Sequence, residues 1–338
     1  MTTRTRYFVI ASLLVTGVGL STGLVAYYVG FPAGAFQRQG GPEELQYVSR
    51  DAAVIAFADV REIMTSDLRQ RLLKTLPMKE DGQREFQEKT GINIETDLDR
   101  IVAAVNTNPE GMKMPGGGVI LARGRFDEAK IELLMKEHGA HVEDYRTKRL
   151  ILGDSDGQDR FAMAFLEPGL VAFGTTGTVR SAIDLHQGGG NPNTGLASVT
   201  SNEELMNLVR SLETGNAWAV GRFDTLTAGA HLPEEISSRL PPITWFSIST
   251  HVNGGIRGVV RAEARDDESA GNLRDVVRGF LALAKMQAGN NAQFQLMAQS
   301  LELGGTGRTV ALSFAVPSEL FDMIGAATRR DLPKPPAQ

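Results

Sequence analysis

The chain contains no cysteine, which excludes disulfide bonds, zinc–thiolate sites and cysteine nucleophiles. It has only five histidines in 338 residues, so few side chains can serve as imidazole ligands or bases. It also lacks an excess of basic residues, since the formal net charge is −5. A mildly acidic chain is poorly suited to nucleic acid or to anionic lipid head groups, because both carry negative charge. We therefore predict no nucleic-acid partner and no cofactor.

A long uncharged run is present near the N-terminus. Residues 7–29 (YFVIASLLVTGVGLSTGLVAYYV) contain 23 residues without a charge, which is enough for a transmembrane helix. Arg4 and Arg6 precede this run, so the positive-inside rule leaves the N-terminus in the cytoplasm and exports residues 31–338. The prediction is a single-pass protein of the bacterial inner membrane with a periplasmic main domain.

A cleaved signal peptide is the alternative interpretation of the same run. Ala33-Gly34-Ala35 resembles a signal-peptidase site, but the apolar core of a signal peptide has only about 7–15 residues. The greater length favours an uncleaved anchor. Within it, Gly19 and Gly23 form a G-x-x-x-G spacing that lets two membrane helices approach closely, although small residues are common in membrane helices. A homodimer through the anchor is therefore one hypothesis.

A pattern of buried strand, aspartate and amphipathic helix recurs along the exported region. Its clearest copies are Ala53–Leu73, Gly116–His138 and Ala217–Thr227. Asp59, Asp127 and Asp224 stand at the junctions between strand and helix. There a carboxylate can accept hydrogen bonds from the unpaired N–H groups of the first helical turn. We therefore predict that these three aspartates are helix caps.

The order of predicted elements repeats once along the chain. Each half is predicted to begin strand–helix–strand–strand–helix–strand, which is the element order of a ferredoxin-like sandwich. The predicted fold class is α+β, with an N-terminal transmembrane helix followed by two tandem ferredoxin-like modules, each with an extra strand and helix, that arose by internal duplication. The predicted boundaries are 1–30 for the cytoplasmic stub and anchor, 31–44 for a spacer, 45–187 for the first module, 188–200 for a linker, 201–327 for the second module and 328–338 for a disordered tail.

Three predictions concern the second half. Asn253-Gly254 indicates a hairpin between strands at Ile243–His251 and Ile256–Ala264. Asn272–Gln287 is predicted to be a helix with one apolar face, formed by Leu273, Val276, Val277, Phe280, Leu281, Leu283 and Ala284. Phe294–Leu303 and Thr309–Val316 are predicted to pair as strands.

The segment Gly153–Gly157 (GDSDG) matches the G-x-S-x-G pattern of serine hydrolases. That nucleophile elbow needs a helix after the serine, whereas a strand is predicted after Ser155, so a hairpin turn is the favoured interpretation. Asp154, Asp156 and Asp159 could instead surround a calcium ion, but the glutamate that closes an EF-hand loop does not follow at the required distance.

His138 and His141 are the histidines with ligand-like spacing. Two histidines three residues apart on a helix could share a zinc ion, which normally needs a third protein ligand. Gly139 lies between them and is expected to end the helix, and a histidine near a helix C-terminus is favourable through the helix dipole alone. We therefore predict no catalytic, cofactor or metal site. If a metal were bound, the candidate ligands would be His138, His141, Asp154, Asp156 and Asp159.

Several parts of the chain are similar to those of other proteins, namely the anchor, the spacer and the segments AFADVREI, ARGRFDEAKI and AFLEPGLVAFGTTGTVRSAID. In these features the chain resembles a group of uncharacterised exported bacterial proteins with an N-terminal membrane anchor and tandem α+β modules. The resemblance implies an extracytoplasmic location and brings no functional residues.

The absence of a convincing catalytic motif favours an envelope protein that binds a protein or a ligand, with an envelope protein as the expected partner, and not an enzyme. An envelope hydrolase or metal-dependent enzyme, using Ser155 or the two histidines, is the alternative. A small-molecule or lipid carrier with a cleft between the modules is a further alternative. The loops at 107–118, 153–159 and 188–193 are where the two halves are predicted to differ, so function is expected there.

Overall fold

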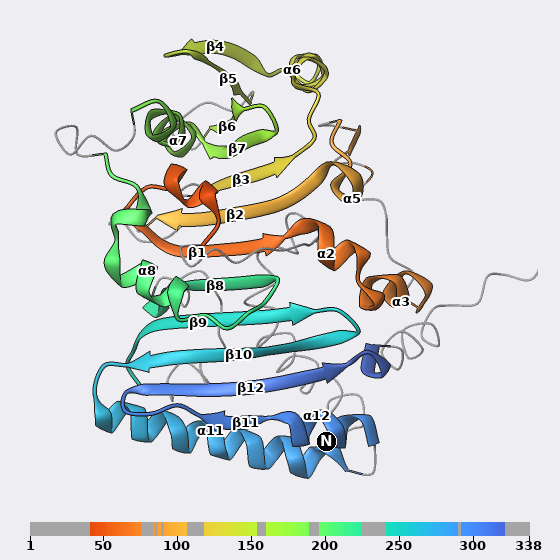
Figure 1. Ribbon diagram of the computed structural model, residues 1–338, viewed down its shortest axis with the longest axis vertical. Helices are drawn as coiled ribbons and strands as arrows, with labels where there is room; N and C mark the ends of the chain where they lie inside the picture. The colour runs from red at the N-terminus through yellow and green to blue at the C-terminus, as the bar shows by residue number, and fades with distance from the viewer. Residues whose placement is uncertain are drawn as a thin grey trace, which may run out of the picture.

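All the strands that the structure describes lie in one antiparallel sheet (Figure 1). The computed structural model describes residues 41–75, 84, 87–88, 91–106, 118–153, 160–188, 196–224, 241–289 and 292–321. The sheet has twelve strands in the order β11-β12-β10-β9-β8-β1-β2-β3-β7-β6-β5-β4. The first half of the chain therefore forms one side of the sheet and the second half forms the other.

The strands of the first half are β1 (Ala52–Asp59), β2 (Leu98–Asn106), β3 (Gly118–Gly124), β4 (His141–Tyr145), β5 (Lys148–Leu152), β6 (Phe161–Glu167) and β7 (Leu170–Thr175). Those of the second half are β8 (Ala217–Arg222), β9 (Ile243–Val252), β10 (Gly255–Ala264), β11 (Glu302–Gly304) and β12 (Thr309–Pro317). The helices are η1 (Glu43–Tyr47), α2 (Val60–Thr65), α3 (Asp67–Thr75), α5 (Ile94–Asp97), α6 (Glu128–Glu137), α7 (Thr176–Gly188), η3 (Val199–Ser201), α8 (Glu203–Arg210), α11 (Asp267–Ala288) and α12 (Ala292–Ser300).

The prediction of two tandem ferredoxin-like modules is wrong. A ferredoxin-like βαβ unit places its two strands parallel, with another strand between them. Here β1 and β2 flank the helices α2, α3 and α5, yet they are antiparallel neighbours, with Ile55 opposite Ala104. The short helices lie beyond the ends of the strands, so the chain reverses direction and does not cross over.

The first strands of the two halves, β1 and β8, meet at the centre of the sheet. We call this pairing the seam. Val54 lies opposite Gly221, Ile55 opposite Val220 and Ala56 opposite Ala219. When the two strands are aligned on their aspartates, Asp59 and Asp224, Ile55 corresponds to Val220. The pairing is therefore symmetric about Ile55 and Val220, and β2, β3 and β7 occupy places equivalent to those of β9, β10 and β12.

Helices cover both faces of the sheet. One face carries η1, α7 and α8, whose apolar side chains pack on Ile55 and Leu121 in the largest buried cluster. Ile101 and Ala122, neighbours of Val102 and Leu121 in sequence, point to the opposite face and pack on α6. α11 and α12 lie on this second face too. Ala262 of β10 packs on α11 and is paired with Phe246 of β9, so both side chains point to the same face. Phe246 clusters with Val54, whose side chain points away from the face that Ile55 occupies.

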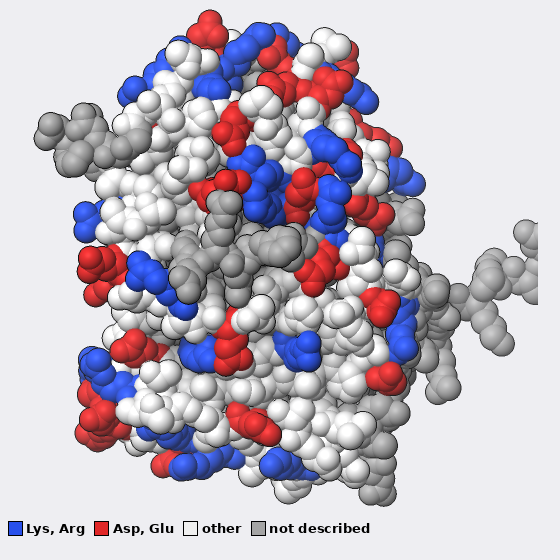
Figure 2. All heavy atoms as spheres, viewed as in Figure 1, with Lys and Arg blue, Asp and Glu red and all other residues white. Residues whose placement is uncertain are grey.

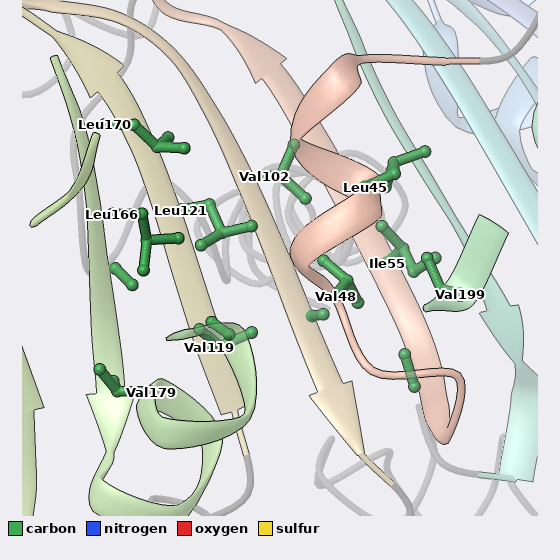
Figure 3. Close-up of a cluster of buried hydrophobic side chains, with 14 of the residues drawn as sticks. Leu45, Val48, Ile55, Val102, Val119, Leu121, Leu166, Leu170, Val179 and Val199 are labelled. Atoms are coloured by element: carbon green, nitrogen blue, oxygen red, sulfur yellow. The ribbon is translucent and has the colours of Figure 1, made fainter. Parts of the chain in front are cut away.

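Residues that precede β1 close the largest cluster. Figure 3 shows Leu45 of η1 and the adjacent Val48 lying over β1 and β2, beside Ile55 and Val102. All four side chains are fully buried. Val199, from the segment predicted as a linker (188–200), is buried in the same cluster, and Ser198 forms a β-bridge with Ser49.

The predicted hairpin at Asn253-Gly254 is confirmed, since β9 and β10 pair across it. The predicted strand Phe294–Leu303 is wrong over most of its length, because Ala292–Ser300 forms α12 and the following strand, β11, has only three residues. Phe294, Met297 and Ala298 recur at helical spacing, and Phe294 and Met297 pack on Val316 of β12.

The predicted membrane span, residues 7–29 with Gly19 and Gly23, lies outside the described residues, as does the predicted tail, 328–338. Within the described part of the chain, no helix combines the length and the apolar character needed to cross a membrane.

Candidate functional site

The longest described helix, α11, is held to the sheet by its N-terminal half. Asp266 caps it, accepting a hydrogen bond from the N–H of Ser269 at 2.7 Å. Ala270 and Leu273 are buried against Ala264 and Val310 of the sheet, with Val277 partly buried beside them. Arg274 donates to the carbonyl oxygen of Thr309 at 3.1 Å. These contacts fix the rotation of the helix and therefore decide which of its side chains point outward.

The C-terminal half of α11 presents large apolar side chains to solvent. Phe280, Leu283 and Met286 are 37%, 47% and 72% exposed, and Leu296 on the adjoining helix α12 is 59% exposed. Six large hydrophobic residues are exposed in the described part of the chain, and four of them are in this group. Spacings of three place Phe280, Leu283 and Met286 on successive turns of one side of the helix. We call these four residues the α11–α12 ridge.

Helices α11 and α12, which carry the ridge, lie at the β11 end of the sheet (Figure 1). Along α11 the charges balance, with Asp267, Glu268 and Asp275 against Arg274, Arg278 and Lys285. Arg278 and Asp275 form an exposed ion pair at 2.8 Å. The ridge is therefore an apolar surface bordered by charged residues of both signs, which is typical of a protein-contact surface.

The helix was predicted from the sequence, but the exposure of its apolar residues was not. The sequence placed Phe280 and Leu283 on one apolar face with Leu273, and the structure buries Leu273 but leaves Leu283 47% exposed. The seven apolar residues assigned to that face span an arc wider than one sheet surface can cover. That excess width was the available signal of an exposed apolar side.

A second feature is a network of arginines and glutamates on the opposite face of the sheet. Glu44 of η1 is 1% exposed, and its Oε1 accepts a hydrogen bond from Nε of Arg123 at 2.5 Å and forms an ion pair with Nε of Arg100 at 3.0 Å. Arg123 also donates to Glu167 at 2.7 Å, and Arg100 donates to Glu43 at 2.8 Å. We call these five residues the arginine–glutamate network. Figure 2 shows acidic and basic side chains gathered on this face, over the first half of the sheet.

Burial and nearby charges shift the pKa values of Arg123 and of two groups beside the network. Burial lowers the pKa of Arg123, but the hydrogen bonds that Arg123 donates to Glu44 and Glu167 outweigh burial and raise that pKa above its ordinary value. Burial, followed by the charge of Glu167, raises the pKa of Tyr47. Burial and Lys148 lower the pKa of His186, whose ring lies 5.3 Å from the Tyr47 ring. Both arginines are paired with glutamates and the histidine favours its neutral form, so the network fastens η1 to the sheet and is poorly suited to binding an anion.

The structure separates the two histidines with metal-ligand spacing. α6 ends at Glu137, Nδ1 of His138 lies 2.8 Å from the carbonyl oxygen of Leu134, and Gly139 adopts a φ of +88°. His141 begins β4. Within the described ranges, no group of three or more histidine, aspartate or glutamate side chains could hold a metal ion. Asp154, Ser155, Asp156 and Asp159 lie outside those ranges.

The three aspartates predicted as helix caps differ in their surroundings. Asp127 accepts a hydrogen bond from the N–H of Lys130 at 3.0 Å, which is a capping contact. Asp224 is exposed and accepts from Arg222 at 2.5 Å and 3.1 Å. Asp59 occupies the N-cap position of α2, but its side chain makes no capping hydrogen bond within the described structure.

Comparisons with known proteins give little for this chain. No protein-family model matches it, and no curated protein matches it. A solved structure, crystal form I of TP0453, is similar over 86% of this chain and 99% of that chain, with a TM-score of 0.43 and 8% sequence identity. A similarity of this level assigns no function and no ligand.

Proposed function

We propose that this chain is an interaction protein of the cell envelope that binds a protein partner through the α11–α12 ridge. The observation that carries the proposal is that Phe280, Leu283 and Met286 are exposed on one side of α11, with Leu296 exposed on the adjoining helix α12. Scattered apolar residues on a surface need no explanation, whereas a group of them marks a site of contact. The uncharged run at residues 7–29 supports the envelope location.

Other features make the alternatives less favourable. A carrier with a cleft between two modules requires the modules to be separable, but β1 and β8 join the halves through one strand pairing. An enzyme that uses the two predicted histidines requires them to converge, but His138 caps α6 and His141 belongs to β4.

A protein is a better partner for the ridge than a lipid surface. Helices that bind membranes carry lysine and arginine on their polar side, which attracts anionic lipids. Beside the ridge α11 carries only Arg278, which is paired with Asp275, and Lys285, so it lacks the cluster of basic side chains that such helices use. An apolar surface with a mixed border matches the centre and rim of a protein interface.

Photocrosslinking in intact cells tests this proposal. A benzophenone amino acid replaces Met286 in the full-length chain, and irradiation is expected to give a discrete adduct that contains a second polypeptide. Leu283→Asp in the same chain is expected to reduce the adduct at least about tenfold, because a charge at a contact core opposes association. A second copy of this chain, recognised by an adduct of twice its mass, counts as a protein partner.

Leu133 provides the matched control position. It is also a leucine, is 60% exposed and lies on α6, outside the ridge. The probe at Leu133 is expected to give no discrete adduct. Equal adducts at both positions, adducts to lipid alone, or an adduct that persists with Leu283→Asp would contradict the proposal.

A further inference from the structure

Helices α2 and α3 connect the two halves of the sheet. They begin at the end of β1, in the first half, and run along the strand ends to the turn between β9 and β10 (Figure 1). There the N–H of Leu68 donates to the carbonyl oxygen of Asn253 at 2.7 Å, and Arg71 donates to Oγ of Ser318 at 2.6 Å. Ile63 and Leu68 pack with Val252 in a separate buried cluster. We call α2 and α3 the strap.

Asp59 lies where the strap leaves the sheet. Its N–H donates to the carbonyl oxygen of Asn216 at 2.8 Å, which ties the backbone across the seam. Its side chain is 2% exposed, and within the described structure Oδ1 has no hydrogen-bond partner. A buried carboxylate that is neither paired nor hydrogen-bonded is strongly unfavourable, whereas a neutral carboxyl group is tolerated.

The charged groups around Asp59 do not compensate for its burial. On β2, Arg100 is paired with Glu43 and Glu44, and on α2, Arg61 is paired with Asp99. Glu62 of α2 and Glu44 of η1 add repulsion. Burial, followed by Glu62, raises the pKa of Asp59 to about 7 from its ordinary value of 3.8, although Arg100 and Arg61 act in the opposite direction.

The equivalent residue in the other half shows the contrast. Asp224 corresponds to Asp59 by the symmetry of the seam, yet it is exposed and accepts two hydrogen bonds from Arg222. Of these two equivalent aspartates, only Asp59 is buried and unpaired, and it is the one that lies at the start of the strap.

We infer that Asp59 is a protonation-dependent latch, whose neutral carboxyl group keeps the strap docked across the seam and whose ionisation loosens it. Loosening lets the carboxylate reach water and separates Leu68 and Arg71 from their partners in the second half. This inference rests on the seam and the strap, and it is independent of the α11–α12 ridge.

The direction of the pH dependence follows from the two protonation states. In a loosened strap Asp59 titrates near 3.8, and in the docked strap near 7. The docked state therefore binds its proton more tightly, so its advantage is complete below pH 3.8 and is lost as the pH rises through about 7. Above that range both states are ionised and docking no longer depends on pH.

Hydrogen–deuterium exchange of the full-length protein tests the latch. Protection factors for residues 60–72, corrected for intrinsic exchange, are expected to fall at least about tenfold between pH 5 and pH 8. Protection in β3 is expected to change far less. Asp59→Asn keeps the shape of the neutral carboxyl group and cannot ionise, so its protection at 60–72 is expected to be the same at both pH values within about twofold.

Asp224→Asn is the matched control, and it is expected to retain the pH dependence of the wild type. Protection of the strap in the wild type that does not change with pH would overturn the inference, and this result needs no variant. An equal pH response in the wild type and Asp59→Asn, or its loss in Asp224→Asn, would overturn it as well.

Discussion

Replacing Arg123 with leucine is expected to lower the free energy of unfolding by about 3 kcal/mol, the low end of the range for breaking a buried ion pair. Of the two arginines that contact Glu44, Arg123 makes the shorter contact. Glu44 is 1% exposed, and its Oε2 has no hydrogen-bond partner in the described structure. The variant leaves this buried charge with Arg100 alone, and it also removes the bond to Glu167. Urea denaturation of the purified protein measures the loss.

Two further variants show whether the charge of Glu44 causes that loss. The double variant with Arg123→Leu and Glu44→Leu removes both partners and is expected to recover most of the stability, because the orphaned charge is absent. Arg278→Leu breaks an exposed pair with Asp275 and is expected to change stability by about 0.5 kcal/mol or less. Equal losses from Arg123→Leu and Arg278→Leu would show that the arginine–glutamate network adds no more than a surface pair.

Gly221→Ala at the seam is expected to destabilise the protein by about 1–3 kcal/mol. A methyl group on Gly221 would lie 2.5 Å from the carbonyl oxygen of Ala53 and 2.7 Å from Cα of Val54. These are backbone atoms of β1, so the clash can be relieved only by moving the two central strands apart. Thermal and urea unfolding of the purified protein measure the effect.

Gly271→Ala is the opposite case among the described glycines. It lies in α11, and a methyl group there would meet no atom within 4 Å. The variant is expected to stabilise the protein by about 0.5–1 kcal/mol, because alanine loses less backbone entropy than glycine in a helix. Effects of the same sign at Gly221 and Gly271 would contradict the close approach of β1 and β8.

Local signals predicted local structure. Asn253-Gly254 predicted the β9–β10 hairpin, and Gly139 was expected to end α6, which separates His138 from His141. Such features depend on the conformations that a few adjacent residues can adopt. They need no information about the rest of the chain, which is why a single sequence was enough to predict them.

Local sequence signals could not predict the order of the strands in the sheet. A helix between two strands is compatible with a crossover to a parallel strand or with a reversal to an antiparallel one. The pattern after β1 favoured the crossover, but Ile55 pairs directly with Ala104 of the next strand. The pairing of Ile55 with Val220 joins residues far apart in sequence, and no local sequence pattern around either residue indicates which strand it pairs with.

The surroundings of Leu283 and Asp59 could not be predicted, for related reasons. Leu283 shares an apolar helix face with Leu273, but the spacing of apolar residues does not show how much of that face the sheet covers. Asp59 was predicted as a cap because an aspartate before a helix favours that role. Its actual state depends on Asn216, Glu62 and Arg100, which come from three different segments.

The single twelve-stranded ladder has only two edge strands within the described structure, β4 and β11. Unpaired edges can recruit further strands and lead to aggregation, and short length or charge protects against this. β11 has three residues, and the five residues of β4 include Glu143 and Asp144. Both described edges are therefore protected, and self-association by strand addition is disfavoured. Contacts with other chains are then left to the side-chain surfaces of the helices that cover the sheet.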